Sequence, residues 1–175
     1  MNKILVTGLI GAGKSEVCAY LAGLGYSVYD SDSRTKALYC STPGLKTRIE
    51  EAIGCPFSEI EIIFRDAAKR EALEAVVYPL VLQDFRRFCA ESSAETVFFE
   101  SAVAFGKEQF AGEFDKTVLV RAPYDVRLSR NQKVGQRASS QEEMPLGKAD
   151  YIIDNNSGLR ELHDQVDRMI KTFKI

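Results

Sequence analysis

The sequence predicts one α/β domain in which a parallel β-sheet is flanked by helices. Short apolar or β-branched runs, typical of buried strands, recur along the chain and are separated by segments with helical periodicity. These runs lie near residues 3–7, 27–30, 95–100, 116–121 and 150–153. Strands that alternate with helices indicate a parallel sheet. The length of 175 residues suits a single domain spanning the chain, 1–175.

The first predicted strand leads directly into a glycine-rich loop. Residues 8–15 read Gly-Leu-Ile-Gly-Ala-Gly-Lys-Ser, and apolar residues at helical spacing follow. This strand, loop and helix fit the phosphate-binding loop of P-loop NTPases, in which main-chain N–H groups surround phosphates at a helix N-terminus. Lys14 is expected to reach the β- and γ-phosphates, and the Ser15 hydroxyl to ligate Mg²⁺. The loop residues expected to contact the nucleotide are Gly8, Gly11, Ala12, Gly13, Lys14, Ser15 and Glu16.

The interval between the second and third predicted strands, 33–94, is far longer than one crossover helix requires. We expect it to form a small helical lobe that recognises the acceptor of the phosphoryl group. An apolar stripe in this interval is interrupted at Tyr78-Pro79, where proline should kink or restart the helix. Tyr78 and Pro79 are candidates for a substrate groove, with packing in the core as the alternative. The stripe comprises Leu73, Val76, Leu80, Phe85 and Phe88.

Composition excludes several classes of function. The net charge of -2 argues against a nucleic-acid partner bound by bulk electrostatics, and no apolar stretch approaches membrane-spanning length. The four cysteines form no Cys-x-x-Cys pair, and the single histidine is His163, so neither a zinc site nor a disulfide framework is indicated. We expect a cytoplasmic protein whose partners are small molecules, and which is a monomer or a weak homo-oligomer.

Three carboxylates follow predicted strands at the edge where open α/β sheets bind ligands. Asp30 and Asp32 follow the second strand, and Glu100 ends the third. Asp30 is the favoured functional residue, which would take a proton from the acceptor hydroxyl or position the hydration shell of Mg²⁺. Asp32 would hold the acceptor or simply cap the next helix. Glu100 would assist the metal or the acceptor, or form an ordinary salt bridge.

A basic segment from Arg121 to Arg137 is a candidate lid over the phosphates, and the lid is predicted to span 124–148. Guanidinium groups bind phosphate oxygens through two donors at once, and Arg130 and Arg137 are the expected contacts. A solvated basic face is the alternative. Asn155 follows the last predicted strand, where the base of a bound nucleotide would sit, and is a further candidate contact.

The ordered set of these motifs resembles the dephospho-coenzyme A kinases, and the resemblance covers nearly the whole chain. The stretches that carry it are 7–15, 28–32, 73–81, 114–120 with Ala122-Pro123, 137–141 and 149–156. The resemblance implies a P-loop core that binds ATP and Mg²⁺, a helical lobe for the coenzyme A moiety and a lid. It implies ATP-dependent phosphorylation of the ribose 3′-hydroxyl of dephospho-CoA, with Asp30 as the base and Arg137 acting from the lid.

The chain departs from the family's usual residues at several positions. Glu16 replaces a threonine, Lys36 an arginine and Tyr78 a histidine, and only six residues separate Arg130 from Arg137, so the lid is short. Two alternatives therefore stay open. One is a kinase for another small hydroxyl or nucleotide acceptor, and the other is a catalytically degenerate nucleotide-binding member of the family.

Overall fold

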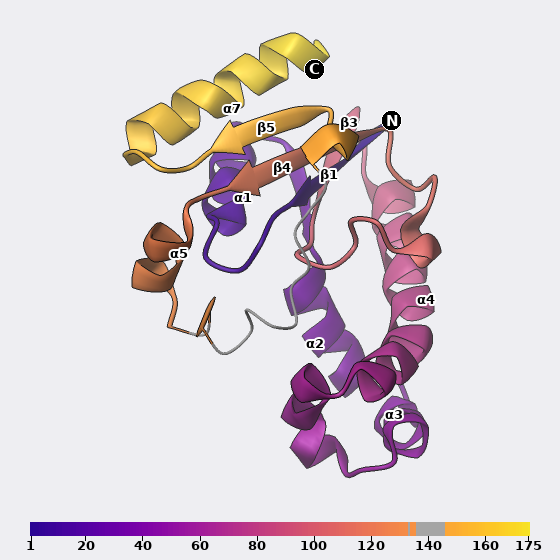
Figure 1. Cartoon of the computed structure of the whole chain (residues 1–175). Coiled ribbons are helices and arrows are strands. Elements are labelled where there is room, and N and C mark those ends of the chain that lie inside the picture. The colour runs from indigo at the N-terminus through magenta and orange to yellow at the C-terminus, as the bar shows by residue number, and fades with distance from the viewer. Residues whose placement is uncertain (133, 136–145) are drawn as a thin grey trace. The chain divides into compact units, whose positions relative to one another are not determined.

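The computed structural model describes residues 1–132, 134–135 and 146–175, and it divides into two compact units. The first unit comprises Met1–Asp30 and Ser92–Ile175, and the second comprises Ser31–Glu91. Figure 1 labels most of the helices and strands of the two units. Among the described residues, no helix combines the length and the apolar composition that crossing a membrane requires.

The first unit is built on a parallel sheet of five strands in the order β2-β3-β1-β4-β5. The strands are β1 (Asn2–Thr7), β2 (Ser27–Asp30), β3 (Thr96–Glu100), β4 (Lys116–Arg121) and β5 (Tyr151–Asp154). Among the elements whose bounds the structure defines, this unit contains the helices α1 (Lys14–Gly23), α5 (Tyr124–Arg130) and α7 (Leu159–Phe173), with short 3-10 turns at Glu108–Phe110 and Leu146–Lys148. The predicted strands and the parallel α/β fold are confirmed.

Alternation along the strands gives the sheet two buried faces. On one face, Ile4 and Val6 of β1 pack with Phe98 of β3 and with apolar residues of α1 and α7. On the other face, Phe99 of β3 contacts Phe114 in the segment that leads to β4. Burial on both faces explains why these strands read as continuous apolar runs, and it fixes the register that brings the strand ends together.

The second unit contains α2 (Ser31–Ser41), α3 (Leu45–Ile53), a 3-10 segment at Phe57–Arg65 and α4 (Ala67–Glu91). The sequence predicts that proline kinks or restarts the helix at Pro79. The restart is wrong, because α4 runs as one helix through that exposed residue. Proline removes a single main-chain donor. The packed face of α4 offsets this loss, since it buries residues along several turns. That face holds Leu73, Val77, Val81 and Phe85, so it is rotated from the stripe expected from the sequence.

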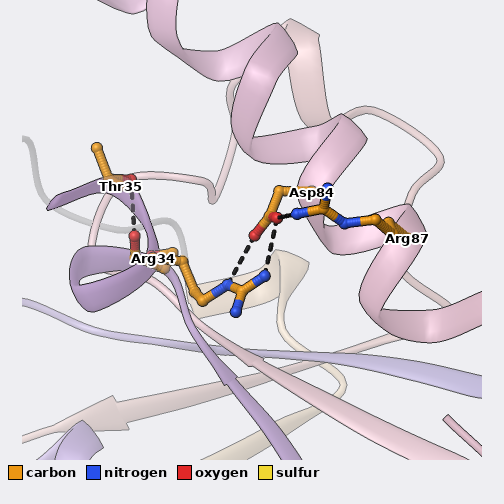
Figure 2. Close-up of polar contacts among 5 residues, drawn as sticks. Arg34, Thr35, Asp84 and Arg87 are labelled. Carbon is orange, nitrogen blue, oxygen red and sulfur yellow. Dashed lines mark hydrogen bonds and ion pairs between the residues drawn. The ribbon is translucent and has the colours of Figure 1, made fainter. Parts of the chain in front are cut away.

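A buried carboxylate joins α2 to α4 in the second unit. The Arg34 guanidinium donates two hydrogen bonds to Asp84, from Nε to Oδ2 at 2.7 Å and from Nη2 to Oδ1 at 2.8 Å. Arg87 also donates to Oδ1 (Figure 2). The Asp84 side chain is 3% exposed, whereas that of Arg34 is 42% exposed. A carboxylate so deeply buried requires such partners, because an unpaired charge in the interior is costly.

We expect Arg34→Gln to lower the free energy of unfolding by about 1–3 kcal/mol, because it leaves the buried Asp84 carboxylate with fewer donors. Arg48→Gln on α3 is the matched control, since Arg48 is exposed in the same unit, and it should change stability by less than about 0.5 kcal/mol. Urea unfolding of both variants makes the comparison. Equal stability of the two variants would show that the Arg34–Asp84 pair contributes nothing.

Candidate active site

The glycine-rich loop connects β1 to α1 at the carboxyl edge of the sheet. Gly8 has a φ of 151°, and a Cβ built on it would lie 2.1 Å from the Val120 carbonyl oxygen of β4. A side chain therefore cannot be accommodated there, and glycine lets the main chain pass directly against the sheet. The N–H groups in the first turn of α1 lack intrahelical partners and carry the positive end of the helix dipole. This end of the loop is suited to bind an anion.

The two side chains that follow the loop glycines are held at its mouth. The Lys14 ammonium donates to the Leu9 carbonyl at 3.5 Å, which places it across the loop, and its side chain is half-buried. The Ser15 hydroxyl donates to Glu100 Oε1 at 2.7 Å. Sequence spacing alone placed Ser15 and Glu100 at the same edge, and the structure brings them into direct contact.

Asp30 and Glu100 lie on neighbouring strand ends, because β2 and β3 pair with Asp30 opposite Glu100. Burial raises the pKa of Glu100, and the negative charge of Asp30 adds to this, while the hydrogen bond from Ser15 and the charge of Lys14 oppose it. The charges of Lys14, Asp30 and Glu100 thus act on one another in one small region. Cys18, buried on α1, also contacts Glu100, and burial followed by the Glu100 charge raises the pKa of its thiol.

The raised pKa of Glu100 predicts a pH-dependent stability. When the pH rises past the ordinary glutamate pKa, the unfolded chain releases its proton before the folded chain does, so the wild-type protein loses stability until the pH passes the raised pKa. Glu100→Gln removes this loss. We therefore expect the free energy of unfolding of the variant to increase relative to that of the wild type as the pH rises from the ordinary glutamate pKa toward the raised pKa of Glu100.

Urea unfolding at pH values from about 4 to 8 measures the difference. Glu95→Gln is the matched control, because Glu95 is an exposed residue immediately before β3. If the free energies of unfolding of the wild type and of Glu100→Gln differ by the same amount at every pH, the raised pKa of Glu100 is contradicted.

Glu16, the first departure from the family's usual residues, turns toward α7. Its Oε1 lies 3.8 Å from His163 Nε2, and the His163 ring stacks on Tyr20 with centroids 3.9 Å apart. Tyr20 in turn donates to Asp167 at 3.1 Å. The Glu16 carboxylate is therefore directed toward α7, and its main-chain N–H is the group suited to a phosphate.

The basic segment divides into residues with different surroundings. Arg121 lies opposite Asp154 in the β4–β5 register and pairs with that carboxylate, so it belongs to a cross-strand pair rather than to a lid. Arg127 Nη1 donates to the Ile10 carbonyl of the loop at 3.4 Å. Arg130, at the end of α5, donates to both the main chain and the side chain of Asn155. Arg137 lies outside the described residues, as do residues 133 and 136–145 of the predicted lid, 124–148.

The acceptor candidates Asp32, Tyr78 and Pro79 belong to the second unit. Asp32 is an exposed residue in the first turn of α2, where a carboxylate favours the helix N-terminus. Tyr78 is buried on α4, and burial, followed by the charge of Glu74 one turn earlier, raises the pKa of its phenol. Pro79, on the same helix, is exposed.

Sequence reasoning missed two contacts that shape the first unit. The cysteine spacing gives no sign that Cys18 contacts Glu100, because that contact depends on the packing of α1 against β3. The sequence also gives no sign of the role of Gln165 on α7. Its side-chain Oε1 accepts a hydrogen bond from the Asp154 N–H at 2.9 Å, and its Nε2 donates one to the Asp154 carbonyl at 2.8 Å. No local pattern marks either residue, because each partner lies on another element.

Comparison with known proteins decides among the kinases that share this loop. A sequence model of the dephospho-CoA kinase family matches residues 59–161. The chain belongs to the dephospho-CoA kinase family. A relative named dephospho-CoA kinase from Porphyromonas gingivalis is 32% identical over 99% of this chain and 95% of its own length. Another, from Fusobacterium nucleatum, is 28% identical over 96% of each chain.

Solved structures agree with the fold. The crystal structure of TT1252 from Thermus thermophilus superposes with a TM-score of 0.81 at 29% identity, covering 99% of this chain and 98% of that one. A shikimate kinase from Acinetobacter baumannii gives a TM-score of 0.59 at 19% identity, covering 100% of this chain and 96% of that one, which shows a shared fold alone. The family resemblance and the kinase class predicted from the sequence are confirmed.

Proposed function

We propose that this chain transfers the γ-phosphoryl group of ATP to the ribose 3′-hydroxyl of dephospho-CoA, giving CoA and ADP in the last step of CoA biosynthesis. The observation that carries the proposal is the family match across a chain whose phosphate loop lies beside two carboxylates at adjacent strand ends. The alternative of another small acceptor is not favoured, because the named relatives extend over nearly the full chain.

The first unit supplies groups for the nucleotide. The loop amides from Gly8 to Glu16 and the Lys14 ammonium would bind the phosphates, and Lys14 would stabilise the charge that develops on the transferred group. Arg130 would contribute further donors. Arg137 is proposed to complete the site from the lid, since a guanidinium stays charged and binds phosphate in a bidentate manner.

The residues around Ser15 fit Mg²⁺. The Ser15 hydroxyl and the Glu100 carboxylate, 2.7 Å apart, offer hard oxygen donors, which Mg²⁺ prefers. Ser15 would ligate the ion, and Glu100 would hold the Ser15 hydroxyl or a metal-bound water. A bound Mg²⁺ would supply positive charge that neutralises the negative charge of the phosphates.

Asp30 is proposed as the base. As the acceptor 3′-oxygen forms a bond to the γ-phosphorus, the bond to the bridging oxygen breaks, ADP leaves with that oxygen, and Asp30 takes the hydroxyl proton. The second unit, Ser31–Glu91, is proposed to bind the acceptor. Asp32, Tyr78 and Pro79 are its candidate contacts, with Glu100 as a further one on β3.

A panel of acceptors tests this specificity. Purified protein with MgATP should convert dephospho-CoA to a product one phosphate heavier, detected by mass spectrometry, and leave AMP, GMP, cytidylate and shikimate largely unchanged. Faster turnover of any other member of the panel would support a kinase with a different acceptor. No turnover together with measurable ATP binding would support a degenerate nucleotide-binding protein.

A further inference from the structure

Asn155 is a polar residue buried beside the phosphate loop. It is 6% exposed and lies in the turn between β5 and α7. The turn is held by the main chain, because the Asn155 N–H donates to the Arg121 carbonyl at 2.8 Å. The preceding residue, Asp154, is bonded at both main-chain groups by Gln165. These hydrogen bonds to the main chain of Asp154 and Asn155 therefore hold Asn155 in place beside the loop.

The Asn155 amide joins the loop to α5. Its Nδ2 donates to the Ala12 carbonyl at 2.9 Å, and its Oδ1 accepts from Arg130 Nη2 at 3.3 Å. Arg130 Nη1 also donates to the Asn155 main-chain carbonyl at 3.2 Å. These partners fix the orientation of the amide, because the opposite orientation would set oxygen against oxygen at Ala12 and an N–H donor against the Arg130 cation.

The loop glycine opposite this amide leaves room for it. A Cβ built on Gly13 would lie 2.1 Å from Asn155 Nδ2 and 3.9 Å from Arg130 Nη1. Gly13 also has a φ of 100°, which L side chains rarely adopt. The close approach is an observation independent of the hydrogen bonds, and it shows that the amide and the Arg130 guanidinium lie directly over the loop.

We propose that Asn155 is a positioning residue that couples the phosphate loop to Arg130, an inference that rests on the proposed nucleotide site. Only a side chain that donates and accepts at adjacent atoms can hold the Ala12 carbonyl and the guanidinium together. The two bonds that Arg130 gives to Asn155 leave its other N–H donors for phosphate oxygens, at a place set by the loop itself. This role differs from the direct nucleotide contact expected of Asn155 from the sequence.

The first test compares Asn155→Asp with Asn156→Asp. Asn156 is exposed in the same turn, so both variants add one carboxylate at nearly the same place, but only Asn155→Asp removes the donor to Ala12. We expect the Kd for MgATP to rise about tenfold in Asn155→Asp relative to Asn156→Asp, because a buried carbonyl loses its partner. The KM for ATP should rise with it, while the KM for dephospho-CoA stays within about twofold.

The second test is a double-mutant cycle between Asn155→Ala and Arg130→Ala, read as the Kd for MgATP. Asn155→Ala should raise the Kd for MgATP by one factor in the wild type and by a smaller factor in the Arg130→Ala background. We expect the first factor to be about threefold or more larger than the second. Equal factors in the two backgrounds would overturn the coupling. An Asn155→Asp variant that lowers only the midpoint of unfolding, with the same Kd as Asn156→Asp, would overturn the positioning role.

ATP binding does not depend on the identity of the acceptor. The two tests therefore distinguish a failure of the Asn155 inference from a failure of the proposed reaction, which only the turnover assay can report.

Discussion

Lys14→Ala is expected to lower the rate of phosphoryl transfer by about 10²- to 10³-fold or more, with the fold intact. The Lys14 ammonium lies across the loop, within 3.5 Å of the Leu9 carbonyl, and is the side-chain cation closest in sequence to the loop amides. Removing a positioned cation from a site where charge develops in the transition state costs several kcal/mol, because its electrostatic stabilisation of the transferred group is lost. Steady-state kcat with saturating MgATP and dephospho-CoA measures the effect.

Lys171→Ala is the control for the loss of one positive charge, because Lys171 is exposed near the end of α7. Its kcat should match that of the wild type, and both variants should unfold at nearly the wild-type temperature. A Lys14→Ala enzyme with near-normal kcat would remove the loop lysine from the mechanism.

Asp30→Asn is expected to lower kcat by about 10²- to 10⁴-fold while the Kd for MgATP changes little. Asparagine keeps the size and shape of the side chain but cannot take the proton of the acceptor hydroxyl. The residue ends β2 opposite Glu100, so its main chain is held by the sheet and the substitution should leave the strand in place.

Asp32→Asn and Glu100→Gln complete this comparison. A loss of kcat in Asp30→Asn that exceeds the loss in Glu100→Gln assigns the base to Asp30, whereas a rise in the KM for dephospho-CoA is expected for Asp32→Asn. If Asp30→Asn weakens MgATP binding as much as it lowers kcat, Asp30 acts on the metal or the structure and not as the base.

The sheet and its loop could be predicted because their signals are local. The apolar runs mark strands buried on both faces, and the glycine spacing of residues 8–15 belongs to one continuous segment. The helix restart expected at Pro79 was wrong, because the loss of one main-chain hydrogen bond was outweighed by packing along the whole face of α4. The apolar spacing in that interval likewise did not show which residues of α4 face its core.

The candidate site was predicted in outline, since strand ends place Asp30 and Glu100 at one edge. The side-chain contacts within the site could not be predicted from the sequence, because they join residues far apart in the chain. The bond from Ser15 to Glu100 and the bond from Asn155 to Ala12 each depend on the register of the sheet. The pairing of Arg121 could not be predicted for the same reason. In the sequence it belongs to a basic segment, whereas the register of β4 and β5 places it opposite Asp154.

The most direct test of the proposed reaction is the position of the phosphate on the product. Purified protein is incubated with MgATP and dephospho-CoA, ADP is quantified, and the product is compared with authentic CoA by chromatography and phosphorus NMR. The account predicts one ADP for each CoA formed, with the new phosphate on the ribose 3′-oxygen and product formation by the Lys14→Ala variant at about a hundredth of the wild-type rate or less. ADP release that does not depend on dephospho-CoA, or a phosphate on any other oxygen, would contradict it.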